Sequence, residues 1–310
     1  MKASRICTMD REGFLGYLYT GSSTEGRCMI VLAGDDGNDF LDQAFARWFT
    51  RYQSCSALCL ALRQDPSEDP GLNLWNLNTV LEAVKWLKTQ DYHKIGICGI
   101  SMQAVIALSA AARIPEISLT LAFSPCDYVP WGFRHGPVGK RKKEEYPTGK
   151  SLLTWKGQPL PFQDAHMKKE EYSSLFHEDS RKNHELHSRG IFDRSEALGQ
   201  IPEPAFIPAE RSRGALILIG AEDDSMWNCT RYICRMRRRL QQKEFILPVK
   251  CFTYPHGTHL LLPQRMIMDA LPLVGGLVSW LFVSGRHHPS ACKAARVHLD
   301  QQLSCTLSGW

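Results

Sequence analysis

The sequence predicts an α/β fold in which a mostly parallel sheet is covered by helices on both faces. From about residue 27 onward, short apolar runs alternate with longer amphipathic segments, the pattern of strands joined by helical crossovers. The chain has 310 residues, of which 44% are hydrophobic and 22% are charged. This length and composition are sufficient to bury one large core.

The expected elements follow the apolar runs in chain order. Strands are predicted at 28–33, 57–62, 94–99, 119–124, 215–220 and 248–254, and helices at 39–51, 74–89, 101–113, 226–242 and 263–282. In the second helix, apolar residues recur at steps of three and four, as in Val80, Val84 and Leu87. A short β pair, 5–8 with 16–20, is expected before the first core strand.

The alternation stops near residue 126 and resumes near 213. A structureless loop of that length is rare in a compact domain, so we expect a mostly helical cap at about 126–212, lying over the site. The predicted domain spans 1–286 with this insertion. A polar C-terminal tail, 287–310, follows it with one short helical pattern at 291–303.

One strand leads into a serine in a setting typical of a nucleophile elbow. The apolar strand 94–99 runs into Gly99-Ile100-Ser101, and a small-residue helix follows from Ala104. In α/β-hydrolases this strand–turn–helix exposes the serine hydroxyl in a G-x-S-x-G pattern. Here the last glycine is replaced by Gln103. A serine at this position is also a common helix N-cap.

A catalytic serine needs a base and the base needs an orienting acid, which α/β-hydrolases supply in the order Ser, Asp/Glu, His after late strands. The strand 215–220 is followed by Glu222, Asp223 and Asp224. The strand 248–254 is followed by His256 and His259. The order and the strand ends favour a triad, and the residues alone leave the choice of acid and of base open.

Two backbone N–H groups are the predicted oxyanion hole, which stabilises the charge on the reacting carbonyl oxygen. One belongs to Met102, the residue after the candidate nucleophile. The other is expected from the glycine-containing loop 33–37 after the first core strand, at Asp35. That loop is equally typical of an ordinary strand-to-helix turn.

Several of these segments together resemble the acyl-coenzyme A thioesterases and bile acid-CoA:amino acid N-acyltransferase, in their C-terminal α/β-hydrolase domain. The resemblance covers roughly residues 27–285. It rests on Gly99-Ile-Ser101, Phe206-Ile-Pro-Ala-Glu210, Gly220-Ala-Glu-Asp-Asp-Ser-Met-Trp227 and Tyr254-Pro-His-Gly-Thr-His259. About 26 residues precede it, so the chain is similar to the shorter, single-domain microbial relatives.

The resemblance implies which residues form the site and what they do. It assigns the nucleophile to Ser101, the acid to Asp224, three residues before Trp227, and the base to His259. The implied activity is hydrolysis of an acyl-CoA thioester through an acyl-enzyme. An acyltransferase with an amine or alcohol acceptor is the alternative, although that branch carries cysteine at the nucleophile position. A weakly active hydrolase-fold binding protein is a third reading, suggested by Gln103 and the acidic loop 33–37.

Composition sets further expectations about partners and location. The net charge of +5 is too small for a nucleic-acid-binding signature, so the expected partner is a small acyl thioester or ester. The longest apolar stretch, 270–283, is too short to span a membrane and contains Pro272. Eleven cysteines without a C-x-x-C pair, and no signal-peptide pattern, favour a cytoplasmic protein with reduced thiols. No cofactor or metal is expected, and homo-oligomer formation stays open.

Overall fold

A computed structural model describes residues 2–310 apart from 23–24, 35, 64–70, 139–140 and 272–274. Its central sheet has the strand order β1-β2-β4-β3-β6-β7-β12-β13. The strands are β1 (Arg5–Cys7), β2 (Gly16–Tyr19), β3 (Arg27–Leu32), β4 (Ser56–Leu60), β6 (Lys94–Ile100), β7 (Ile117–Phe123), β12 (Ala215–Ala221) and β13 (Val249–Tyr254). All pairs from β4 to β13 are parallel, while β1 and β2 add an antiparallel edge. The predicted mostly parallel sheet is confirmed.

Both faces of the sheet are buried, which explains why its strands are continuous apolar runs in the sequence. In β3, Cys28 and Ile30 point into one core cluster, while Met29 and Val31 point into the other. Alternate side chains of a strand lie on opposite faces, so a strand covered on both sides needs apolar residues throughout.

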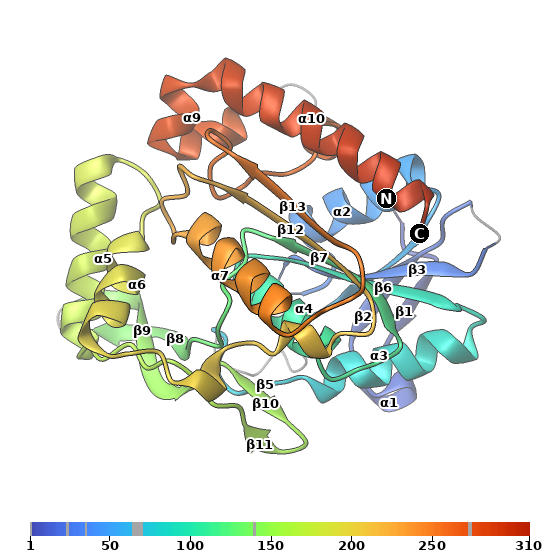
Figure 1. The fold of residues 1–310 in the computed structure, drawn as a ribbon, viewed down its shortest axis with the longest axis horizontal. Coiled ribbons are helices and arrows are strands. Elements are labelled where there is room, and N and C mark those ends of the chain that lie inside the picture. Colours follow the sequence, from blue (N-terminus) through green and yellow to red (C-terminus); the bar gives the residue numbers. More distant parts are fainter. Residues whose placement is uncertain (1, 23–24, 35, 64–70, 139–140, 272–274) are drawn as a thin grey trace.

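Helices form a layer on each face (Figure 1). The helices α3 (Asn78–Thr89), α4 (Met102–Ala111) and α7 (Cys229–Gln242) pack on one face, and α2 (Phe40–Tyr52), α8 (Gln264–Ala270) and α10 (Pro289–Ser308) pack on the other. Among the described residues outside the insertion, the other helical elements are the short helices α1 (Met9–Glu12) and α9 (Val283–His287) and the 3₁₀ turn η3 (Gly275–Leu281).

The insertion after β7 is a mixed cap and not the mostly helical one that the sequence predicted. It contains the hairpin β8 (Trp131–Val138) and β9 (Arg141–Ser151), the short strands β10 (Leu153–Trp155) and β11 (Gln158–Pro159), the helices α5 (Lys169–Asn183) and α6 (Arg189–Leu198), and the 3₁₀ turns η1 (Glu203–Ala205) and η2 (Ala209–Arg211). β10 also pairs with β5 (Trp75–Asn76), which ties the cap to the segment before α3. Figure 1 shows the cap gathered at one end of the sheet.

The C-terminal segment differs from its prediction in two places. The helix expected at 263–282 ends at Ala270, and Pro272 and the glycine pair at 275–276 account for this because both residue types disfavour helix. The expected peripheral tail is the helix α10, which buries Leu299, Leu303 and Leu307 in the core. The periodic apolar residues of this C-terminal segment therefore pack in the core.

The structure also describes the cysteines and the length of the apolar helices. All eleven cysteines are free thiols. Within the described ranges, no helix combines the length and the apolarity that crossing a membrane requires.

Candidate active site

Ser101 stands on a strained turn between β6 and α4. Its backbone has φ 61° and ψ −127°, a conformation that residues with a Cβ rarely adopt. The turn is held because the Ser101 N–H donates to the Phe123 carbonyl at 2.9 Å and the Ser101 carbonyl accepts from the Ala104 N–H at 2.9 Å. Gly99 is required before it, since a Cβ there would overlap the Gln103 carbonyl. The predicted strand–turn–helix is present.

Asp224 and His259 lie together at the carboxyl ends of β12 and β13. The His259 Nδ1 lies 3.0 Å and 2.9 Å from the two Asp224 carboxylate oxygens. Asp224 is fully buried and also accepts the Met226 N–H at 2.8 Å and the Trp227 N–H at 3.3 Å. Such a carboxylate favours the imidazole tautomer with its proton on Nδ1, which leaves a lone pair on Nε2.

The alternative acid and the alternative base occupy a neighbouring position. The Asp223 carboxylate accepts the N–H groups of Gly257, at 3.1 Å, and Thr258, at 2.8 Å. It also accepts the Ser284 hydroxyl, and His256 Nδ1 lies 3.4 Å from it. Asp223 therefore holds the backbone of the loop that carries His259, while His256 stacks on His288.

The end of β7 contacts both the turn that carries Ser101 and the loop that carries His259. Ser124 follows Phe123, the residue that accepts the Ser101 N–H, and the Ser124 hydroxyl donates to the His259 carbonyl at 2.8 Å. The His259 Nε2 is buried and, within the described residues, has no hydrogen-bond partner, so the Ser101 hydroxyl is not bonded to it. Catalytic hydrogen bonds are often long before substrate binds.

Sequence reasoning missed Ser124, and it named Trp227 only as part of a motif, although both residues organise this site. Ser124 ties the histidine loop to β7, and its carbonyl accepts the Trp227 indole N–H at 3.0 Å. The Trp227 ring stands edge-to-face against His259, with 5.4 Å between ring centroids. The signal for Ser124 was present, because a polar residue at the end of an apolar strand marks the functional edge of such a sheet.

Only one of the two predicted oxyanion donors can be placed. Met102 is the first residue of α4, and N–H groups of a first helical turn have no partner within the helix. Asp35 lies outside the described residues. Next to it, the Gly34 N–H donates to the buried carboxylate of Asp42 at 3.0 Å. Burial raises the pKa of Asp42 to about 8.

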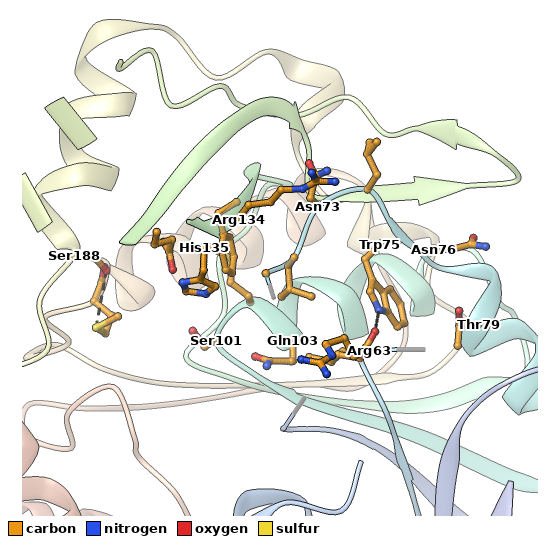
Figure 2. Close-up of a pocket in the computed structure, with 18 of the residues that line it drawn as sticks. Arg63, Asn73, Trp75, Asn76, Thr79, Ser101, Gln103, Arg134, His135 and Ser188 are labelled. Carbon is orange, nitrogen blue, oxygen red and sulfur yellow. Dashed lines mark hydrogen bonds between the residues drawn. The ribbon is translucent and has the colours of Figure 1, made fainter. Parts of the chain in front are cut away.

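Ser101 opens onto a cavity of about 810 Å³ between the sheet and the cap. Figure 2 shows Ser101 and Gln103 on one side and Arg134 and His135 of the cap hairpin across from them. Gln103 lines the cavity, and Arg63 also lines it. The side chain that replaces the usual elbow glycine thus has space because it extends into the cavity.

A continuous aromatic wall connects the histidine to the cap. From Trp227, the next ring is Phe192, edge-to-face at 5.0 Å, and Phe192 stacks on Trp131 at 5.0 Å. Trp131 meets Tyr172 edge-to-face at 6.2 Å. Three of these residues, Phe192, Trp227 and Tyr172, line the cavity, so one side of it is apolar and rigid.

The family described as BAAT / acyl-CoA thioester hydrolase C terminal matches residues 77–266, more than half of the chain. The chain belongs to this family. Comparison with curated protein sequences finds no match.

Solved structures similar to this family member share its fold at low sequence identity. MGS-M1, an α/β-hydrolase enzyme from a Medee basin deep-sea metagenome library, has a TM-score of 0.53 and 12% identity over 100% of this chain and 99% of its own. The Pyrococcus furiosus esterase PF2001 has a TM-score of 0.51 and 13% identity over 90% of this chain and 88% of its own. The predicted α/β-hydrolase fold is confirmed.

The family-like motif 206–210 has a structural role in this member of the family. Its Glu210 binds Arg239 of α7 through two hydrogen bonds, at 2.9 Å and 3.0 Å. One turn earlier, Arg235 makes a bidentate pair with the buried Asp127 at 2.6 Å and 2.8 Å. These arginines fasten both ends of the cap to α7.

In the described part of the chain, one cluster of three carboxylates is close enough to bind a single cation. It consists of Asp36, Asp39 and Asp42. Two of the three already serve the start of α2. Asp39 accepts the Leu41 and Asp42 N–H groups, and Asp42 accepts the N–H groups of Gly34 and Asp39. These contacts form a capping box, which accounts for the cluster without a metal.

Proposed function

We propose that the protein is a serine-dependent hydrolase of acyl esters or thioesters, with Ser101 as nucleophile, His259 as base and Asp224 as orienting acid. The observation that carries this proposal is the buried pair of Asp224 and His259. In the described structure the His259 Nε2 has no hydrogen-bond partner. The strained Ser101 turn supports it, because strain of this kind persists where surrounding structure enforces it for function.

The reaction follows from these positions. His259 Nε2 takes the Ser101 proton as Oγ attacks the acyl carbonyl, and the Met102 N–H binds the resulting oxyanion. His259 then passes the proton to the leaving thiol or alcohol, which departs and leaves an acyl ester on Ser101. Water, deprotonated by His259, attacks this ester; the bond to Ser101 Oγ breaks, His259 returns the proton to that oxygen, and the carboxylic acid is released. Asp224 supports the imidazolium in both halves of the reaction.

An acyl-coenzyme A thioester is the substrate that family membership favours. The cavity provides groups for both parts of such a molecule. Aromatic residues line one side, which suits an acyl group, and Arg63 and Arg134 line it as well, which suits phosphate-bearing groups. Since the candidate nucleophile is serine, the acyl-enzyme is an oxygen ester, and water is the proposed acceptor.

Labelling with a fluorophosphonate probe tests the nucleophile. We expect the wild type to label and the Ser101→Ala variant not to label. Ser174→Ala, on the exposed surface of α5, is the matched control and should label like the wild type. Equal labelling of the Ser101→Ala variant and the wild type would overturn the assignment.

The substrate class needs a separate measurement. Release of free coenzyme A from a panel of acyl-CoA thioesters should depend on Ser101, with the free acid as product. Adding glycine or taurine separates hydrolysis from transfer, because an amide product would identify the acyltransferase alternative. Hydrolysis of simple esters without any thioester activity would show that the leaving group is an alcohol.

A further inference from the structure

A carboxyl group of the cap lines the cavity, and within the described residues only one of its two oxygens accepts a hydrogen bond. Glu145 of β9 is half-buried, and its Oε1 accepts the Tyr172 hydroxyl at 2.6 Å. Within the described residues no other hydrogen bond or ion pair joins Glu145, so Oε2 remains available to the cavity. Burial raises the pKa of this carboxyl.

The hydrogen bond from Tyr172 holds the Glu145 carboxyl in position at the cavity. Tyr172, which donates to it, is buried and stands against the Trp131 ring at the end of the aromatic wall. The wall begins at His259 through Trp227. Glu145 is therefore anchored to the same rigid set of rings that contacts the candidate base.

A hydrogen-bond donor lies directly across the hairpin. His135 of β8 is the register partner of Glu145 in the antiparallel β8–β9 pair, so both side chains lie on the same face. Both also line the cavity, and the His135 ring is supported edge-to-face by Phe133 at 6.0 Å. Figure 2 shows His135 facing the cavity on the side across from Ser101.

We propose that Glu145, Tyr172 and His135 form a subsite for a neutral hydroxyl group on the acyl part of the substrate. A hydroxyl donates to the free Glu145 oxygen and accepts from the imidazole, which uses both groups. An ammonium group has no lone pair to accept from the imidazole, and a carboxylate would be repelled by Glu145. The subsite rests on the proposed function, since the acyl group must reach from Ser101 to the cap.

Matched pairs of p-nitrophenyl esters test this specificity. Each pair has the same chain length and differs in a terminal hydroxyl or a terminal methyl, over short to medium chains. In the wild type, the ratio of kcat/KM for hydroxyl over methyl should peak at one length. In Glu145→Leu that ratio should fall about tenfold or more, because a site built to bond a hydroxyl discriminates strongly. Glu170→Leu, an exposed glutamate on α5, is the control and should keep the wild-type ratio.

Three outcomes would overturn the proposal. One is a ratio that is the same in the wild type and Glu145→Leu at every length. The second is a preference for terminal ammonium esters that Glu145→Leu abolishes, which would assign the subsite to a cation. The third is an unchanged ratio in Tyr172→Phe, since this near-isosteric variant removes only the hydroxyl that positions the Glu145 carboxyl.

Binding without turnover separates this proposal from the catalytic one. In Ser101→Ala, calorimetry should show that a free hydroxyalkanoic acid binds more tightly than the matching alkanoic acid, and that adding Glu145→Leu removes the difference. This result is independent of whether Ser101 is the nucleophile. If labelling rejects Ser101 while the binding difference remains, the catalytic assignment fails and the subsite stands. If labelling succeeds and the difference is absent, the subsite fails alone.

Discussion

Replacing Asp224 with asparagine is the most informative perturbation of the candidate triad. The buried carboxylate accepts two backbone N–H groups and also faces the His259 Nδ1 at 2.9 Å. In Asp224→Asn the carbonyl oxygen keeps the backbone bonds, so the amide NH₂ faces Nδ1. This arrangement favours the tautomer with its proton on Nε2, which cannot take a proton from Ser101. We expect kcat to fall by about 10³–10⁴-fold, or about 4–5.5 kcal/mol, with the fold intact.

The neighbouring Asp223 provides the matched comparison. Asp223→Asn keeps one oxygen for the Gly257 and Thr258 N–H groups and loses the negative charge beside Ser284. We expect kcat within about tenfold of wild type and a loss of unfolding free energy of about 1–3 kcal/mol. Ester hydrolysis measures kcat and urea unfolding measures the unfolding free energy of both variants, which together identify the acid of the triad. An active Asp224→Asn beside an inactive Asp223→Asn would refute the assignment of the acid.

Two further predictions concern stability. Burial raises the pKa of Asp42 to about 8, so the folded chain holds a proton that the unfolded chain releases above about pH 4. The unfolding free energy should therefore fall as pH rises through that window, by up to about 1.4 kcal/mol per pH unit, and Asp42→Asn should flatten the dependence whereas Asp10→Asn should not. Urea unfolding at several pH values measures this, and an unchanged slope in Asp42→Asn would contradict it. Separately, Arg235→Met leaves the buried Asp127 carboxylate without its bidentate partner and should cost about 3–5 kcal/mol in unfolding free energy, part of which Asp127→Asn should recover. A single Arg235→Met variant as stable as wild type would show that the pair contributes nothing.

The sheet could be predicted from the sequence because each of its central strands is apolar on both faces. Loops at the ends of parallel strands meet at one edge, which is why the acid and histidine loops could be expected together. The cap could not be predicted in the same way, since its order comes from distant pairings, such as β10 with β5. Glu145 and Tyr172 give no local signal for that reason, because only the folded hairpin and α5 bring them into contact.

Gln103 affects the space and the polarity around Ser101 more than it affects the stability of the turn. The close approach in this turn is made by Gly99, which packs on the Gln103 carbonyl, and the helix packs inward through the fully buried Ala104. The Gln103 side chain leaves this contact and lines the cavity beside Ser101. The last glycine of the usual pattern is therefore not needed to form the turn here. Its replacement narrows the space near the nucleophile and adds an amide there, so its effect should fall on which acyl groups fit and not on whether the serine is exposed.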